Sequence, residues 1–150
     1  MIDVKKGKIV CDDGVVISRR TRLNRLIKKM RTYIINTKEI NHYTHICLRN
    51  ANVSDGIYDL LLCFNPRNRI ERIDIIPMGR HHMPLRITRG KYVMNDISCL
   101  VSHSDEIEED TRQWLNRYQL EDRKKYSWGE MGIAIDLDRS YYIHAFMNFR

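Results

Sequence analysis

The chain has 150 residues, of which 43% are hydrophobic and 30% are charged, and its formal net charge is +7. This length suits one domain with a core of its own, and the composition excludes a disordered chain. The longest apolar run, residues 57–64, is too short to span a membrane and is interrupted by Asp59. The positive charge favours an anionic partner, either nucleic acid or an acidic protein surface.

The cysteines predict a reducing compartment. None belongs to a CxxC pair, so we expect buried free thiols at Cys11, Cys47, Cys63 and Cys99. Such thiols are typical of the cytoplasm. The N-terminus also lacks the charged-then-apolar order of a signal peptide, and we expect a cytoplasmic protein. With only seven Gly and three Pro there is little room for a linker, so residues 1–150 are predicted to form a single domain.

The first third of the chain predicts a hairpin followed by a helix. Residues 8–11 and 15–17 flank Asp13-Gly14, a strong signal for a tight turn because glycine tolerates a positive φ. Ser18 follows as a candidate helix cap. The helix itself is predicted from apolar residues at helical spacing, which are Leu23, Leu26, Ile27, Met30 and Ile34.

The middle of the chain predicts strands. Residues 44–49 form a strand candidate, closed by turn residues at 50–52 and 54–56. Residues 57–64 and 70–76 then form a hairpin, and the continuous apolar run of the first suggests burial on both faces and a central position. Residues 77–103 are predicted to be mostly loop.

The last third predicts a second helix and a C-terminal hairpin. The helix is indicated by Ile107, Thr111, Trp114, Leu115 and Tyr118, with an acidic cluster in its first turns that suits the positive end of the helix dipole. Strands are expected around residues 133–137 and 142–149, joined by a turn at 136–140. The predicted fold class is α+β, a mostly antiparallel sheet of about six to seven strands with two main helices packed on one face.

No pattern in the chain indicates a catalytic, metal or cofactor site. His42 and His45 have helical spacing, but His45 is placed on a strand, and His81 and His82 would point apart on an extended loop. Phosphate-binding glycine loops and a nucleophile elbow are absent from the sequence. We therefore expect no cofactor, no metal and no enzymatic activity.

The predicted first helix carries the strongest local signal, a run of cations without an intervening acid: Arg19, Arg20, Arg22, Arg25, Lys28, Lys29 and Arg31. Three interpretations stay open, namely a solvated helix face, contact with an acidic protein, and contact with phosphates. The aromatic residues do not interleave with this run as a base-stacking platform requires.

The layout of the chain resembles small bacterial immunity proteins, such as those encoded beside contact-dependent growth inhibition toxins and other polymorphic toxins. The segments that carry the resemblance are GKIV (residues 7–10), DGVVI (13–17), LLCF (61–64), IERI (70–73), YSWGE (126–130) and DLD (136–138). The resemblance implies a cytoplasmic protein that neutralises one cognate toxin domain by covering its active site or substrate-binding surface.

The resemblance assigns no interface residue, so the interface is inferred from charge. Immunity proteins against basic nuclease domains are commonly acidic, whereas this chain is basic, and its toxin is therefore expected to present an acidic patch. The predicted partner-binding residues are Arg22, Arg25, Lys29, Arg67, Arg69, Arg80 and His82. The alternative is a small basic nucleic-acid-binding module that uses the same helix. The identity of the toxin and the oligomeric state stay open.

Overall fold

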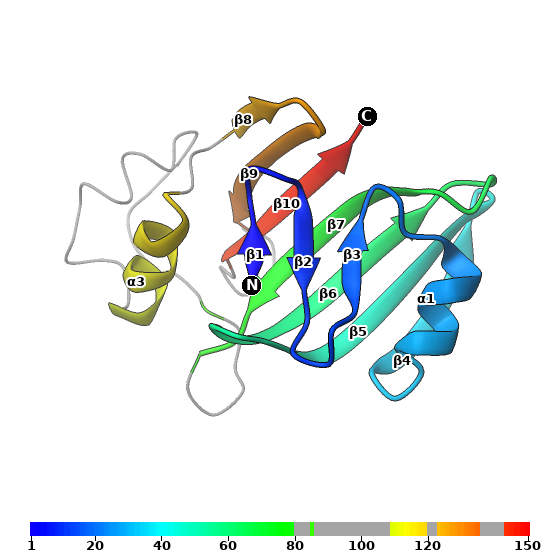
Figure 1. The fold of residues 1–150 in the computed structure, drawn as a ribbon, viewed down its shortest axis with the longest axis horizontal. Helices are drawn as coiled ribbons and strands as arrows, with labels where there is room; N and C mark the ends of the chain where they lie inside the picture. Colours follow the sequence, from blue (N-terminus) through cyan, green and yellow to red (C-terminus); the bar gives the residue numbers. More distant parts are fainter. Residues whose placement is uncertain (80–84, 86–108, 120–122, 136–142) are drawn as a thin grey trace.

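The computed structural model describes residues 1–79, 85, 109–119, 123–135 and 143–150 (Figure 1). Two helices lie in these ranges, α1 (Leu23–Lys29) and α3 (Glu109–Tyr118). The strands are β1 (Ile2–Asp3), β2 (Lys8–Val10), β3 (Val16–Ser18), β4 (Ile34–Ile40), β5 (Tyr43–Val53), β6 (Gly56–Phe64), β7 (Ile70–Pro77), β8 (Arg123–Tyr126), β9 (Gly129–Ile135) and β10 (Ile143–Phe149). No helix in these ranges has the length and apolar content needed to cross a membrane.

The strands form two antiparallel sheets. The main sheet has seven strands in the order β4-β5-β6-β7-β10-β9-β8, and the small sheet has three in the order β1-β2-β3. A bridge between Cys11 and Val53, with a 2.9 Å hydrogen bond from the Asp12 N–H to the Asn52 carbonyl, joins the small sheet to β5. The predicted α+β class with a largely antiparallel sheet is therefore confirmed.

The two helices and the small sheet pack on the same face of the main sheet. Figure 1 shows α1 and β1–β3 in front of the main sheet, with α3 near one end. Their buried side chains join one hydrophobic cluster with the inner residues of the main sheet; examples are Ile9, Leu26, Leu60, Ile73 and Trp114. Burial of this shared apolar area is the main force that holds the layers together.

The predicted hairpins are present. Gly14 has φ +85° in the turn between β2 and β3, as the Asp-Gly signal required. Residues 57–64 and 70–76 correspond to β6 and β7, which pair antiparallel. At the C-terminus β9 and β10 pair from Gly129–Phe149 to Ile135–Ile143, while the predicted turn at 136–140 lies outside the described residues.

The start and the end of the first helix differ from the prediction. Ser18 ends β3 and caps no helix, because α1 begins only at Leu23, with Arg22 at the N-cap and no side-chain cap bond. Ser18 instead belongs to a tight turn, in which its N–H donates to the Thr21 hydroxyl at 2.9 Å. The helix ends at Lys29, so Ile34 lies in β4, and Ile27 is exposed.

Three strand predictions also need correction. The edge strand β4 was not predicted, because its side chains are mostly exposed and show no apolar alternation. The expected turn at 50–52 lies inside β5, where a bulge and a positive φ at Asn50 absorb the irregularity. Finally, β6 is an interior strand but is not buried on both faces, because Leu61 is 39% exposed. Most of the loop predicted for 77–103 lies outside the described residues.

Candidate functional site

The start of α1 and the tip of the β6–β7 hairpin lie together, although they are distant in the sequence. Arg22 pairs with Arg69 in an isolated β-bridge, and the Leu23 N–H donates to the Asn68 carbonyl at 3.4 Å. Asn68 has φ +59°, a conformation that asparagine tolerates in tight turns. The contact places two groups of predicted partner-binding residues on one surface.

We call this the α1 surface, and it consists of Arg22, Arg25, Lys29, Arg67 and Arg69, all exposed. Helical spacing places Arg25 and Lys29, four residues apart, on one side of α1, and Arg22 precedes them at the N-cap, while Leu23 and Leu26 are buried. The remaining two predicted partner-binding residues, Arg80 and His82, lie outside the described residues.

The backbone of the hairpin tip is held by one side chain. Asn65 Oδ1 accepts hydrogen bonds from the N–H of Arg67 at 2.9 Å and of Arg69 at 3.1 Å. Its Nδ2 donates to Glu71 Oε1 at 2.9 Å. The tip is therefore a fixed turn from which the two arginine side chains project.

A hollow of about 280 Å³, here called the α1 hollow, adjoins the α1 surface. Its cations are Arg20, Arg22, Arg25 and Lys29, and no acidic side chain lines it. Apolar atoms contribute as well, since Val16 lines the hollow and is 47% exposed. Within the described part of the chain, these four cations form no ion pair.

A second and larger hollow lies beside the first and is here called the N-terminal hollow. Its volume is about 550 Å³, and its lining residues are Lys5, Lys6, Lys8, Ser18, Arg19, Arg20, Ser127 and Trp128. Arg19 and Arg20 were predicted to lie on the first helix but belong to the turn between β3 and α1, and the lysines were not predicted as site residues. The sequence does carry a signal for them, the three lysines around Gly7, but their meeting with Arg19 depends on the pairing of β2 with β3.

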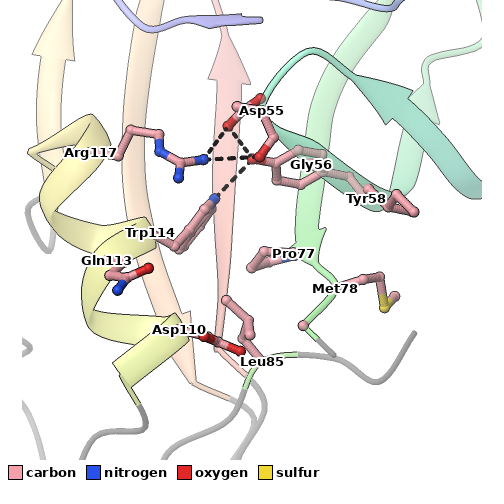
Figure 2. A pocket seen from close by; sticks show the side chains of 12 residues that line it. Asp55, Gly56, Tyr58, Pro77, Met78, Leu85, Asp110, Gln113, Trp114 and Arg117 are labelled. Atoms are coloured by element: carbon pink, nitrogen blue, oxygen red, sulfur yellow. Dashed lines mark hydrogen bonds and ion pairs between the residues drawn. The ribbon is translucent and has the colours of Figure 1, made fainter. Parts of the chain in front are cut away.

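Among the described residues, the largest pKa shifts occur at the other end of the molecule, where α3 meets the turn between β5 and β6 (Figure 2). Asp55 Oδ2 accepts hydrogen bonds from the hydroxyls of Tyr58, at 2.6 Å, and Tyr118. Arg117 Nη1 donates to the same oxygen at 3.3 Å and to the Asp55 carbonyl at 2.9 Å. Trp114 Nε1 donates to the Tyr58 hydroxyl at 3.1 Å. A hollow of about 260 Å³ borders this network.

The protonation of this network fits a structural role. Burial alone would raise the pKa of Asp55, but hydrogen bonds from Tyr118, Tyr58 and Arg117 outweigh it and hold that pKa below its usual value. Burial, and then the bond to Asp55, raises the pKa of both Tyr58 and Tyr118. Near neutral pH the carboxylate is therefore charged and the phenols are neutral, with none of them poised to exchange a proton. The network ties α3 to the main sheet.

The histidines and cysteines of the described ranges do not gather into a metal site, since no group of three or more potential ligands is found there. His42 lies in the β4–β5 turn with φ +69°, and His45 Nε2 lies 3.9 Å from Cys63 Sγ. Cys11, Cys47 and Cys63 are free, but of these only Cys11 is buried as predicted; Cys47 and Cys63 are half-buried, and Cys99 lies outside the described residues. Burial, and then Asp13, raises the pKa of Cys11 to about 11, so this thiol stays protonated and unreactive.

Comparison with known proteins identifies no relative: no protein-family model, no curated protein and no solved structure matches the chain.

Proposed function

We propose that this chain is an immunity protein that binds a cognate bacterial toxin domain through the α1 surface and covers its active site or substrate-binding surface. The observation that carries the proposal is the bridge between Arg22, at the start of α1, and Arg69, at the hairpin tip. The toxin as partner is taken from the resemblance of the sequence to immunity proteins, and the acidic character of its contact surface follows from charge complementarity.

The α1 surface has the chemistry of a protein interface. Arginine is enriched among residues that dominate binding energies, and it forms paired hydrogen bonds with carboxylates. Protein interfaces also need apolar contacts at their centre. Val16 lines the α1 hollow and is 47% exposed. The α1 hollow therefore offers an apolar side chain next to its cations.

The cations of this surface are free to pair with a partner. Because they form no ion pair with any residue that the structure describes, an acidic surface of the partner would meet charges that need not first leave such a pair. Like charges held close together also repel, and a partner of opposite charge relieves that repulsion. A standard interface needs about 800 Å² from each partner, which a domain of this size can supply.

The cytoplasm is the compartment that fits this proposal. A protein that protects a cell from a toxin acts in the compartment where the toxin acts. The resemblance to immunity proteins implies that this compartment is the cytoplasm. The free thiols of Cys11, Cys47 and Cys63 suit a reducing environment.

The test begins with the partner. The tagged chain is used to capture proteins from its source bacterium at moderate salt, and the captured candidate must arrest growth when expressed alone and lose that effect when this chain is co-expressed. Arg22→Glu/Arg25→Glu is then expected to weaken the complex by at least about tenfold and to abolish protection, because it turns two attractive contacts repulsive. Affinity is measured by calorimetry.

The matched control is Lys38→Glu/Arg49→Glu, which lowers the formal net charge by the same amount on exposed residues outside the α1 surface. It should bind the toxin nearly as well as the unchanged chain, and both variants should melt normally. Equal losses in the two variants, or an unchanged affinity in the first, would refute the role of the α1 surface. A captured partner that leaves growth unaffected would refute the immunity function itself.

A further inference from the structure

The N-terminal hollow differs in chemistry from the α1 hollow. Five of its eight lining residues are cations, namely Lys5, Lys6, Lys8, Arg19 and Arg20, and the other three are two serines and Trp128. None of the five cations forms an ion pair within the part of the chain that the structure describes. Asp3, at the end of β1, accepts the Lys6 N–H at 3.1 Å and is not among the lining residues.

The wall of this hollow is rigid. Trp128 is 5% exposed, and its Nε1 donates to the Val4 carbonyl at 3.0 Å. Its ring stacks on Tyr126 at a centroid distance of 5.3 Å and contacts Phe149 at 5.5 Å. The backbone of the loop that carries Lys5 and Lys6 is therefore bonded to a buried indole, which places both residues at the hollow.

The opposite wall is equally constrained. Lys8 of β2 lies directly across from Ser18 of β3, which places Arg19 and Arg20 next to the lysine loop. The Thr21 N–H donates to the Ser18 carbonyl at 2.8 Å and closes the turn that presents both arginines. The positive charges thus come from two neighbouring segments of the fold and converge on one concavity.

Because five of the lining residues are cations, a ligand for this hollow should carry several negative charges. Lysine binds phosphate as a point charge, arginine binds it with paired hydrogen bonds, and the hydroxyls of Ser18 and Ser127 can donate to phosphate oxygens. A protein partner would also require exposed apolar residues, which the α1 hollow offers in Val16 and this hollow lacks.

We propose that the N-terminal hollow binds the phosphate backbone of a single-stranded nucleic acid, without reading its sequence. A single strand can bend into a concavity, whereas a duplex presents its phosphates on a stiff rod. Base stacking would need an exposed aromatic face, and the indole of Trp128 is buried, so binding is through phosphates alone. This inference does not rest on the proposed immunity function, because it uses other residues.

The experiment measures fluorescence anisotropy of a labelled short oligothymidylate, titrated with the full chain over a range of salt concentrations. Lys6→Glu/Arg19→Glu removes one exposed cation from each wall and avoids Arg20, which lines both hollows. The variant is expected to bind about tenfold more weakly at low salt. The slope of log affinity against log salt should become less steep by about 1.4, which corresponds to two lost phosphate contacts on a single strand.

Two protein controls accompany it. Lys38→Glu/Arg49→Glu changes the net charge equally and should stay within about twofold of the unchanged chain, since neither residue lines a basic hollow. Arg22→Glu/Arg25→Glu should retain most oligonucleotide binding, although it disrupts the toxin interface. If all three variants lose affinity equally, net charge alone explains the binding, and the proposal that the N-terminal hollow is the binding site is refuted. If the first variant melts early, Lys6→Ala/Arg19→Ala takes its place, with the same expected loss of two contacts.

Two competing probes decide the ligand class. Poly-glutamate of similar length should bind more weakly than the oligonucleotide, because its carboxylates sit on flexible side chains whose ordering costs conformational entropy, whereas the phosphates are part of the backbone itself. Phosphatidylglycerol vesicles should not compete with the oligonucleotide. Binding of poly-glutamate with equal affinity would assign the hollow to an acidic protein, displacement by vesicles would assign it to a membrane surface, and either result would overturn the proposal.

Discussion

At the scale of single residues, Gly7 determines the shape of the N-terminal hollow. It has φ +60°, and a Cβ atom at this position would lie 2.3 Å from Cδ2 of Trp128. Only a residue without a side chain lets the lysine loop approach the indole this closely. The spacing of the cations around the hollow therefore depends on a residue that carries no charge.

Gly7→Ala is expected to lower the free energy of unfolding by about 2–4 kcal/mol, the sum of backbone strain and the collision with the indole. Urea denaturation measures the loss. Gly14→Ala is the matched control, because Gly14 has φ +85° but nothing within 4 Å of its added Cβ. In Gly14→Ala the free energy of unfolding should fall only by the cost of the backbone strain, about 1 kcal/mol. Equal losses at the two positions would show that the contact with Trp128 is not restrictive.

At the scale of elements, the attachment of α3 depends on one carboxylate. Asp55 lies in the turn between β5 and β6, and three side chains donate to its Oδ2, two of them from the last turn of α3. Trp114 adds its own hydrogen bond to Tyr58 and packs into the core. Helix α3 thus has both an apolar contact and a charge-assisted polar contact with the main sheet.

Asp55→Asn is expected to lower the free energy of unfolding at pH 7 by about 2 kcal/mol, because hydrogen bonds to a charged acceptor are lost. The pKa of Asp55 is depressed in the folded state. Its contribution is therefore present above its unfolded pKa, about 3.9, and is lost as the pH falls through the lower folded pKa. The unfolding free energy of the unchanged chain should approach that of the variant below about pH 4.

Denaturant titrations at a series of pH values measure this difference. Glu130, whose pKa is also lowered, chiefly by the hydrogen bond from Asn148, is present in both proteins, so its contribution cancels. A stability difference that stays constant from neutral to strongly acidic pH would contradict the role of the Asp55 charge.

At the scale of the whole molecule, one core joins all the layers. Trp128 near the β8–β9 turn, Leu26 in α1 and Trp114 in α3 belong to the same hydrophobic cluster, although they come from different elements. A continuous core of this kind predicts that the domain unfolds as a unit. The two basic hollows lie on the side of this core that carries α1 and the small sheet.

Leu26→Asp buries an unpaired charge and is expected to cost about 3–5 kcal/mol. Trp114→Phe and Trp128→Phe each leave one tryptophan as a fluorescent reporter, at opposite parts of the fold. Introduced into either background, Leu26→Asp should lower the urea midpoint of both reporters by the same amount, in step with circular dichroism. A shift in only one reporter would show that the layers unfold separately.

Sequence reasoning predicted the hairpins and α3, because turn chemistry and apolar periodicity act over a few neighbouring residues. It missed β4, whose exposed position at the sheet edge removes the alternation that marks a strand. It also extended α1 to Ile34, since strand residues can match a helical period by chance. Five of the seven predicted partner-binding residues share one surface, a result that rests on the bridge between Arg22 and Arg69.

The sequence by itself determined the α+β class, the antiparallel sheet and the excess of positive charge, because each follows from local pattern or from composition. Only the tertiary structure decided which cations share a hollow. Lys6 and Arg19 line the same hollow because β2 pairs with β3 and because Gly7 lets the lysine loop approach Trp128 closely. The tertiary structure also decided that Asp55, a plain turn residue in the sequence, anchors α3. Such contacts join residues far apart in the chain, and their free energy arises from burial and charge that no local window contains.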